Sequence, residues 1–416
     1  MIIASDPSLS PTAIASARRK ETRLIGLVGM AHLTSHFCQL LLPPLFPWLK
    51  DAFAVSYAQL GFLMTLFFVV SCAVQMLSGF LVDRFGPRPI LFAGMACLAL
   101  SAFAFAASES YVALAAVSVL AGVGNGVFHP VDYTLLNRLV SAGRLGPAYS
   151  VHGVTGSLGW ALAPVLLVTL AAAFSWRIAL VVAGLMVLCV LCVLFLNRSV
   201  LFAPPTLSSS RTESSKMDGG SLGFLAIPAV WMCFAFFLFS AMSLSAVQTF
   251  APEAAGHLHA MPVEWVASCL TIYMACSAAG IVFGGILATQ PERCERVIGV
   301  GFGLAALVAL TLGLVSMPAW GVPVLFGLMG FCAGTGGPAR DMIVKRSTPP
   351  HATGRVYGVV YSGLDIGQAV APLFFGALMD HQHYSGVLIG LAVVQGVLII
   401  SAFRVKQVRR TAVLAA

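Results

Sequence analysis

Apolar residues run along this chain in long blocks, and short polar stretches separate the blocks. Each block has close to the ~20 apolar residues that a helix needs to cross ~30 Å of hydrocarbon. The pattern therefore predicts twelve membrane-spanning helices, at residues 24–46, 59–81, 90–107, 111–136, 148–172, 178–196, 224–249, 265–288, 297–316, 320–343, 356–379 and 385–403.

The polar stretches indicate where the chain divides. Residues 198–223 are rich in Ser, Pro and Gly, which is typical of a linker. Residues 1–23 are rich in Ser, Ala and Pro and end in basic residues, so we expect a disordered tail and no cleaved signal. The expected order is a cytoplasmic tail at 1–23, a six-helix bundle at 24–197, a cytoplasmic linker at 198–223, a second six-helix bundle at 224–403 and a cytoplasmic tail at 404–416.

One stretch of the chain occurs twice. Residues 126–164 match residues 334–372 with a constant offset of 208 and ten identical residues among 39. Both copies hold an apolar helix, a short loop with an Arg and another apolar helix, so the chain is an internal duplication. Positions that differ between the copies are candidates for function, because a shared scaffold keeps what both halves need. The differing pairs include Asp132 with Arg340, His152 with Val360 and Ser157 with Asp365.

The composition agrees with a membrane protein. Hydrophobic residues make up 59% of the chain and charged residues 9%, whereas a soluble domain has about 45–50% and about 25%. The net charge of +8 could suggest a nucleic-acid partner, but 20 of the 23 Lys and Arg residues fall on one side of the predicted helices. The positive-inside rule places that side and both termini in the cytoplasm, and we expect no nucleic-acid partner. We expect a multi-pass protein of the bacterial inner membrane.

The loop after the second predicted helix carries a specific charge pattern. Gly79 is followed four residues later by Asp83, and then by Arg84 and Arg88. This order resembles the loop signature of the major facilitator superfamily, in which the acid and the bases latch the cytoplasmic side. The resemblance implies a gating role for Asp83, Arg84 and Arg88. The matching loop of the second half has Thr289 in place of the acid, which implies a one-sided latch.

The resemblance to this superfamily covers almost the whole chain, because the duplicated six-helix halves and the polar linker match it too. It implies an all-α integral membrane protein with twelve transmembrane helices in two pseudo-symmetric six-helix bundles, the MFS fold. The N-terminal half also resembles the fosmidomycin-resistance-type branch. The segments that carry this likeness are residues 31–33 (AHL), 56–61 (SYAQLG) and 127–130 (VFHP).

Polar residues inside the predicted helices are candidates for a substrate site, because ionisable groups in a bilayer cost on the order of 3 kcal/mol or more. His32, Ser35, His36 and Gln39 share one face of the first helix. We expect His32, His36 and Gln39, together with His129 of the fourth helix, to line a polar cavity.

Other roles are open to the histidines. They titrate in the range needed for proton transfer. His32 and His36 lie at i and i+4 and could bind a metal, but the only Asp, Glu or Cys near their register is Cys38, on another face. We therefore expect no metal and no cofactor. His152 is assigned to packing, because a lone histidine in a helix is usually a hydrogen-bonded packing residue.

In the superfamily, the first, fourth, seventh and tenth helices line the cavity. The resemblance therefore implies that Ser240, Ser243 and Gln248 of the seventh helix and Thr335 of the tenth complete the substrate site. Small polar residues on membrane helices also serve as packing contacts, and that alternative stays open.

Arg340 is the only Lys or Arg inside a predicted helix. Its planar guanidinium could bind a carboxylate or phosphonate of the substrate. Because Asp132 is its repeat-mate, the two side chains could instead form a gate that is closed when the cytoplasmic side is shut. A static salt bridge with Asp132 or Asp341 is the third alternative.

Asp365 shares a helix face with Tyr357 and Tyr361. A buried carboxylate can exchange a proton near neutral pH, which makes Asp365 and Asp132 candidates for proton coupling. Structural pairing is the alternative for Asp365.

These observations predict a secondary transporter that moves a small organic solute, anionic or zwitterionic, by alternating access. We expect protons as the coupling ion, a direction that leans towards export, and a monomer. Proton-coupled uptake of a small carboxylate fits the same residues. An intramembrane enzyme would need an added nucleophile or metal, and a transporter-like sensor an appended soluble domain, so neither is favoured.

Overall fold

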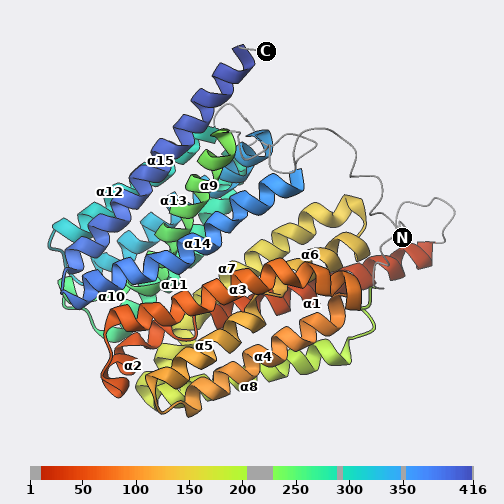
Figure 1. Cartoon of the computed structure of the whole chain (residues 1–416), viewed down its shortest axis with the longest axis horizontal. Coiled ribbons are helices and arrows are strands. Elements are labelled where there is room, and N and C mark those ends of the chain that lie inside the picture. The colour runs from red at the N-terminus through yellow and green to blue at the C-terminus, as the bar shows by residue number, and fades with distance from the viewer. Residues whose placement is uncertain (1–10, 204–227, 288–293, 348–352, 415–416) are drawn as a thin grey trace. The chain divides into compact units, whose positions relative to one another are not determined.

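The described part of the protein is helical. The structure, a computed structural model, describes residues 11–203, 228–287, 294–347 and 353–414 (Figure 1). Within these segments ten helices are long and apolar enough to cross a membrane, and two shorter apolar helices lie at Gly321–Gly337 and Tyr384–Ile400. The predicted all-α membrane architecture is therefore confirmed.

The chain forms two compact units. Unit 1 comprises residues 1–49 and 69–212, and unit 2 comprises residues 50–68 and 213–416, as far as each is described. Most of the predicted linker, residues 204–223, lies outside the described part, so the predicted domain boundaries stay a prediction.

The helices are distributed over the two units as follows. Unit 1 contains α1 (Pro11–Gln39), η1 (Pro43–Leu45), α4 (Pro87–Ala107), α5 (Tyr111–Asn125), α6 (Phe128–Leu139), α7 (Ala142–Ala173) and α8 (Trp176–Leu196). Unit 2 contains α9 (Pro228–Thr249), α10 (Ala251–Leu258), α11 (Val263–Leu287), α12 (Cys294–Leu314), α13 (Gly321–Ser347), α14 (Thr353–Asp380) and α15 (Tyr384–Leu414). Two helices begin in one unit and end in the other: α2 (Phe46–Phe53) and α3 (Tyr57–Phe85).

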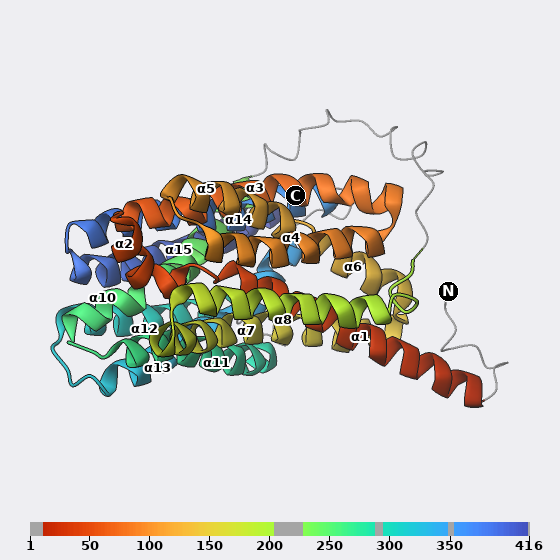
Figure 2. The same cartoon turned by 90° about the horizontal axis from the view of Figure 1, so that it is seen from below.

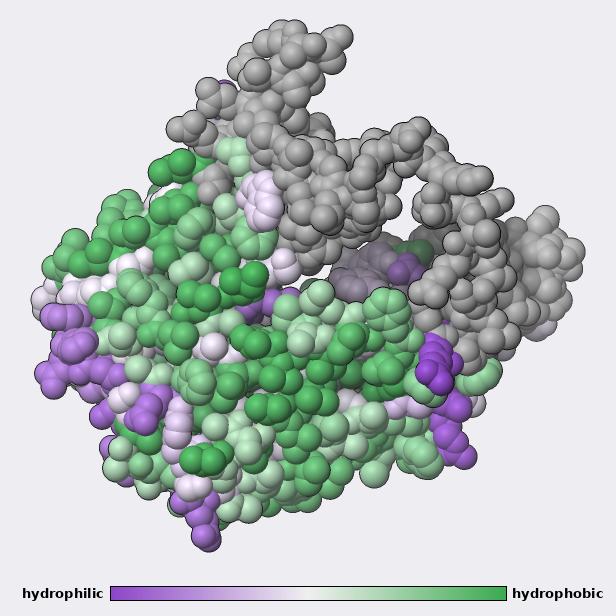
Figure 3. Space-filling model, in the orientation of Figure 1, coloured by the Kyte–Doolittle hydropathy of each residue, from purple (hydrophilic) through white to green (hydrophobic). Residues whose placement is uncertain are grey.

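The outward faces of the helices are apolar. Met76, Val112 and Leu196 are 72%, 76% and 78% exposed. Figure 3 shows hydrophobic side chains over most of the face in view. Exposure of such a large apolar surface to water is unfavourable, so a surface of this kind is stable in contact with lipid.

The first predicted span is not one continuous helix. It was expected at residues 24–46, but α1 ends at Gln39, and η1 and α2 follow. Pro43 and Pro44 cause the break, because proline has no N–H to donate within a helix and its ring displaces the preceding turn. The same break recurs in unit 2, where α9 ends at Thr249 and α10 contains Pro252. Pro252 follows Pro44 by 208 positions, the offset of the internal repeat.

The predicted disorder of residues 1–23 is wrong for residues 11–23. Helix α1 begins at Pro11, more than ten residues before the predicted span (Figure 2). Glu21 attaches this extension to the start of α7: its carboxylate accepts a hydrogen bond from Ser141 N at 3.1 Å and pairs with Arg144 Nη1 at 3.0 Å. The start of α7 therefore stabilises this part of α1, and the composition of residues 11–23 alone does not indicate that contact.

A second helix interruption lies between α5 and α6. Pro130 cannot donate to the carbonyl of Gly126, and Ser78 Oγ donates to that carbonyl instead, at 3.3 Å. A Cβ on Gly126 would lie 2.4 Å from the carbonyl oxygen of Ser71, so only glycine permits this approach of α3. Because of this interruption α6 begins as a separate helix at Phe128, and His129 lies in its first turn.

Helices α1 and α7 pack closely because of two glycines. A Cβ on Gly159 would lie 2.2 Å from the carbonyl oxygen of Leu33, and one on Gly156 would lie 2.7 Å from His36 Nδ1. Small residues that let helix backbones approach are a common packing device in membranes. This contact places the polar face of α1 directly against α7.

Unit 2 includes the first three turns of α3, which pack against α14. Asp380 accepts hydrogen bonds from Tyr57 N at 2.6 Å and Ala58 N at 2.9 Å. Thr65 Oγ1 donates to the carbonyl of Ala369 at 2.6 Å. The Tyr57 hydroxyl also donates to Glu253 of α10. The start of α3 is therefore held by groups more than 190 residues away in the sequence.

Candidate functional site

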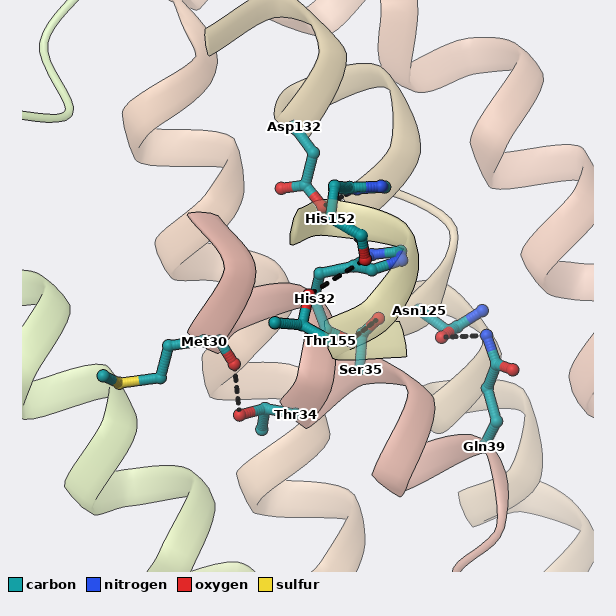
Figure 4. A network of polar contacts seen from close by, with 9 residues as sticks. All are labelled: Met30, His32, Thr34, Ser35, Gln39, Asn125, Asp132, His152 and Thr155. Carbon is teal, nitrogen blue, oxygen red and sulfur yellow. Dashed lines mark hydrogen bonds and ion pairs between the residues drawn. The ribbon is translucent and has the colours of Figure 1, made fainter. Parts of the chain in front are cut away.

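Unit 1 brings together polar side chains from five helices in its interior, and Figure 4 shows part of this network. Five of them form what we call the histidine–aspartate cluster, which consists of His32 and His36 of α1, His129 and Asp132 of α6, and His152 of α7. A second group, from α1, α5, α7 and α3, consists of Gln39, Asn125, Trp160 and Ser71.

Asp132 is the centre of the cluster and has no exposed surface. Its Oδ2 lies 3.1 Å from His152 Nε2 in a hydrogen bond and 3.2 Å from His32 Nδ1. The His32 contact is not aligned as a hydrogen bond, because His32 Nδ1 has no partner by that criterion. Asp132 Oδ1 has no partner among the described residues either. One carboxylate oxygen therefore faces two imidazoles.

The rings of the cluster lie against one another. His32 stacks on His152 with a centroid distance of 3.5 Å and an interplanar angle of 22°. His36 lies 4.2 Å from His32 and stacks on Trp160 at 4.3 Å. Two α1 rings therefore lie between two α7 rings: His32 stacks on His152, His36 stacks on Trp160, and His32 and His36 are tilted by 51° to each other.

The second group is a chain of hydrogen bonds beside this stack. Trp160 Nε1 donates to Gln39 Oε1 at 2.9 Å, and Gln39 Nε2 donates to Asn125 Oδ1 at 3.3 Å. Asn125 Nδ2 then donates to Ser71 Oγ at 2.8 Å. These bonds fix the amide of Gln39 and link α7, α1, α5 and α3.

The sequence-predicted substrate residues fall into two sets. His32, His36, Gln39 and His129 come together in unit 1, as expected from their shared helix face. Ser240, Ser243 and Gln248 lie on α9 and Thr335 lies on α13, all in unit 2. Their part in binding a substrate stays a prediction.

The residues of unit 2 have mixed surroundings. Ser243 Oγ accepts a hydrogen bond from Gln395 Nε2 at 3.1 Å, and Thr335 Oγ1 donates to the carbonyl of Cys332 at 2.7 Å. Such bonds are compatible with packing, the alternative left open by the sequence, and the role of both residues stays a prediction. Gln248 is buried and its Nε2 has no partner among the described residues, and Ser240 is half-buried.

The gating and coupling candidates are less completely described. The side chains of Asp83, Arg340 and Asp341 lie outside the described part. Arg84 is exposed, with its guanidinium 5.2 Å from the ring centroid of Phe85. Arg88 Nη1 donates to the carbonyl of Arg198 at 3.3 Å, and Asp365 is half-buried on α14. Their predicted roles stay predictions.

Sequence reasoning missed the contact between His152 and Asp132. His152 was expected to be a packing residue, but it also hydrogen-bonds the only carboxylate in the cluster. A signal was present, because His152, Gly156 and Trp160 follow one another at i, i+4 and i+8 and so share a face of α7. That face is the one against which α1 packs.

Comparison with known proteins gives a consistent picture. The family model for the Major Facilitator Superfamily matches residues 28–327 and 232–415. The chain is similar to the fosmidomycin resistance protein of Escherichia coli (strain K12), with 29% identity over 178 residues, 42% of this chain and 43% of that protein. It is also similar to the uncharacterized MFS-type transporter YfnC of Bacillus subtilis (strain 168), with 23% identity over 376 residues, 88% of each protein.

The fold has solved counterparts. A crystal structure of a bacterial homolog of the human lysosomal transporter Spinster, inward-facing and unoccupied, has a TM-score of 0.76 and 14% sequence identity. The match covers 94% of this chain and 97% of that one. These similarities confirm the resemblance predicted from the loop and the repeat. Because the family model matches nearly all of the described helices, the chain belongs to the Major Facilitator Superfamily, and its family and fold point to a transporter rather than an enzyme.

Proposed function

We propose that this protein is a proton-coupled secondary transporter that moves a small anionic or zwitterionic organic solute by alternating access. The observation that carries the proposal is the group of buried polar side chains inside a unit built to lie in lipid. Polar and ionisable groups in a bilayer are costly, and they are retained where a solute or an ion passes. Transport of a small solute is also what the family relation supports.

The position of the polar groups agrees with this role. His32, His36 and Gln39 lie on one face of α1, and they contact α5, α6 and α7. Midplane sites between helices are where transporters of this class bind their solutes. We infer that this face of α1 forms the unit 1 side of the solute site, and that Ser240, Ser243, Gln248 and Thr335 contribute from unit 2.

The solute class follows from Arg340. It is the only Lys or Arg in a predicted span, and a guanidinium pairs with carboxylates and phosphonates through two parallel hydrogen bonds. A role of Arg340 in a gate with Asp132 is compatible with this assignment if the solute displaces one partner.

Proton coupling is assigned to Asp365. It is a carboxylate within the membrane-spanning segment Ser362–Asp380, and it is half-buried. A carboxylate in such a place changes its proton occupancy when its surroundings alternate between water and protein. Asp83, Arg84 and Arg88 are assigned to the cytoplasmic latch.

Direction and location are inferred from the relatives and from the charge distribution. The similarity to a fosmidomycin resistance protein favours export, and uptake of a small carboxylate is the alternative. The charge distribution favours cytoplasmic termini in a bacterial inner membrane. We further infer that the chain acts as a monomer.

The test is internal pH in proteoliposomes of the purified protein, challenged with small carboxylates, phosphonates and cationic drugs. We expect a solute-dependent proton flux with anionic or zwitterionic compounds. Lys50→Gln serves as a control, because Lys50 lies outside the predicted spans. Flux with cationic drugs alone would refute the solute class. Solute counterflow without proton flux would refute the coupling, and the absence of any transport by folded protein would refute the function.

A further inference from the structure

Three atoms of the histidine–aspartate cluster call for a ligand. Nδ1 of His32 and of His129 and Oδ1 of Asp132 are buried and have no hydrogen-bond partner among the described residues. Buried polar groups in native proteins are nearly always paired with protein, water or an ion. Three such atoms at one place therefore indicate a shared partner, whereas Nδ1 of His36 faces Gly156 of α7.

The charge of the cluster indicates a cation. Asp132 is fully buried, and a buried carboxylate is paired with a cation or bound to a metal when it is ionised. The segments that surround it supply no basic side chain other than histidine, because no Lys or Arg occurs in residues 24–49, 128–137 or 145–176. Within unit 1, a cation that joins Asp132 is therefore a proton on a histidine or an added ion.

The geometry is close to that of a metal site. One ligand nitrogen from each of His32, His129 and His152 lies within 4.8 Å of the other two. Tetrahedral Zn²⁺ holds nitrogen ligands at about 2.0–2.1 Å, which separates the ligand atoms by roughly 3.4 Å. Asp132 is not in this group of three, but its Oδ2 lies 3.2 Å from His32 Nδ1 and 3.1 Å from His152 Nε2.

We propose that His32, His129, His152 and Asp132 bind one divalent transition-metal ion of the Zn²⁺, Co²⁺ and Ni²⁺ class. Imidazole ligands with a single carboxylate select these ions, whereas Mg²⁺ and Ca²⁺ require mainly oxygen ligands. Binding closes the nitrogens by at most about 1.4 Å and turns His32 out of its stack on His152, because the lone pairs lie in the ring planes. The imidazoles of His32 and His36 lie against Gly156, where a Cβ would be 2.9 Å and 2.7 Å from their nitrogens, so the rotation must be directed away from α7 at this position.

The sequence expectation of no metal rested on the ligands available in one helix. His32 and His36 have no other ligand in their own register, but α6 contributes His129 and Asp132 and α7 contributes His152. The site is assembled from three helices of unit 1. The site shares His32 with the proposed solute site, but its test is independent of the solute and of proton coupling, because metal binding is measured without transport.

The test uses full-length protein in nanodiscs, purified with a histidine-free affinity tag and stripped with a chelator. Zn²⁺ is titrated against a competing fluorescent indicator, and Co²⁺ is followed by its visible absorption. We expect one ion per chain and the intense visible bands of tetrahedral Co²⁺. All measurements use the background His381→Ala/His383→Ala, because these two rings lie 6.2 Å apart and could hold a metal themselves.

Variants assign the ligands. His129→Ala and Asp132→Asn should each weaken Zn²⁺ binding by about 100-fold or more, since even outer-shell changes cost about 10–100-fold. His257→Ala, outside the cluster, should leave it unchanged. His129→Cys should keep Co²⁺ bound and add a thiolate-to-cobalt charge-transfer band, a signature that a packing role cannot produce.

Each alternative result is decisive. Folded, monodisperse protein of the His381→Ala/His383→Ala background that binds neither ion at one per chain overturns the proposal and assigns the unpartnered atoms to protons or water. Unchanged binding in a folded Asp132→Asn/His129→Ala double variant overturns the ligand set. If those variants do not fold, a missing charge-transfer band in Co²⁺-loaded His129→Cys has the same consequence.

Discussion

The two halves of the chain are copies of one design, yet among the described residues the histidine–aspartate cluster occurs in unit 1 alone. At the repeat offset of 208, His32 corresponds to Ser240, His129 to Gly337 and His152 to Val360, while Asp132 corresponds to Arg340. The helix break at Pro44 is kept at Pro252. The duplication has therefore preserved the shape of the helices and changed the chemistry between them.

Gly156 shows how the two interiors diverged. In unit 1 it leaves space for His32 and His36, since a Cβ would lie 2.9 Å from His32 Nε2 and 2.7 Å from His36 Nδ1. In unit 2 the equivalent position is Leu364, which packs against the apolar core around Phe236 and Phe237. One copy uses this position to admit imidazoles, and the other fills it with hydrocarbon.

The largest effect is expected at the pair where the units carry opposite charges. Arg340→Ala should lower transport at least about 30-fold, since truncating one partner of a buried charge pair costs about 2–5 kcal/mol. Arg340→Lys keeps the charge but loses the two-pronged hydrogen bonding, so it should recover only part of the rate. Initial rates in proteoliposomes measure both. Normal transport by Arg340→Ala would remove the gate and the anion site together.

Asp365 tests whether the coupling group lies in unit 2 and not in the cluster of unit 1. Asp365→Asn should abolish the response of solute flux to an imposed pH gradient and leave downhill exchange intact, because the amide cannot carry the proton. The two assays are run on the same vesicles. An unchanged pH response excludes this role.

Substitution at the diverged glycine position should affect stability in unit 1. Gly156→Ala should lower the free energy of unfolding by about 1–3 kcal/mol, because it overpacks the imidazoles. Gly153→Ala is the matched control: a Cβ there meets nothing within 4 Å, and alanine favours the helix by about 1 kcal/mol over glycine. Thermal unfolding in detergent measures both. Equal melting temperatures for the two variants would mean that the α1–α7 contact tolerates a methyl group.

The smallest effect is expected at Ser243, whose role as a packing or a solute contact is still open. Ser243→Ala removes the hydrogen bond from Gln395 and should cost about 1 kcal/mol of stability. If Ser243 only packs, the solute concentration for half-maximal flux stays the same. A tenfold rise in that concentration with normal folding would instead identify a solute contact.

The sequence was sufficient for the helices and for the family, because both depend on local composition. Blocks of apolar residues mark the spans, and Gly79, Asp83 and Arg88 identify the loop. It was insufficient where a distant partner decides the outcome. Residues 11–23 look like a polar tail, but Glu21 binds Ser141 and Arg144 more than 100 positions later.

The sequence predicted only part of the histidine–aspartate cluster, because its members on one helix share a face whereas its contacts between helices depend on distant partners. The polar face of α1 follows from its 3.6-residue period, so His32, His36 and Gln39 could be found. The partner of Asp132 could not, because the repeat pairs it with Arg340, whereas the packing of α6 against α1 and α7 brings two imidazoles to its carboxylate. Periodicity defines the faces of a helix and leaves open which neighbour covers them.

The shared helix α3 has a mechanical consequence. Its residues 57–68 belong to unit 2, held by Asp380 at its first N–H groups and by the close approach of Gly61 to Pro372, while its remaining length belongs to unit 1. One continuous helix therefore belongs to both compact units, with hydrogen bonds to α14 at its first residues. Two spectroscopic labels on α3, one on each side of residue 68, would measure whether the distance along this helix changes. This measurement requires no knowledge of the solute.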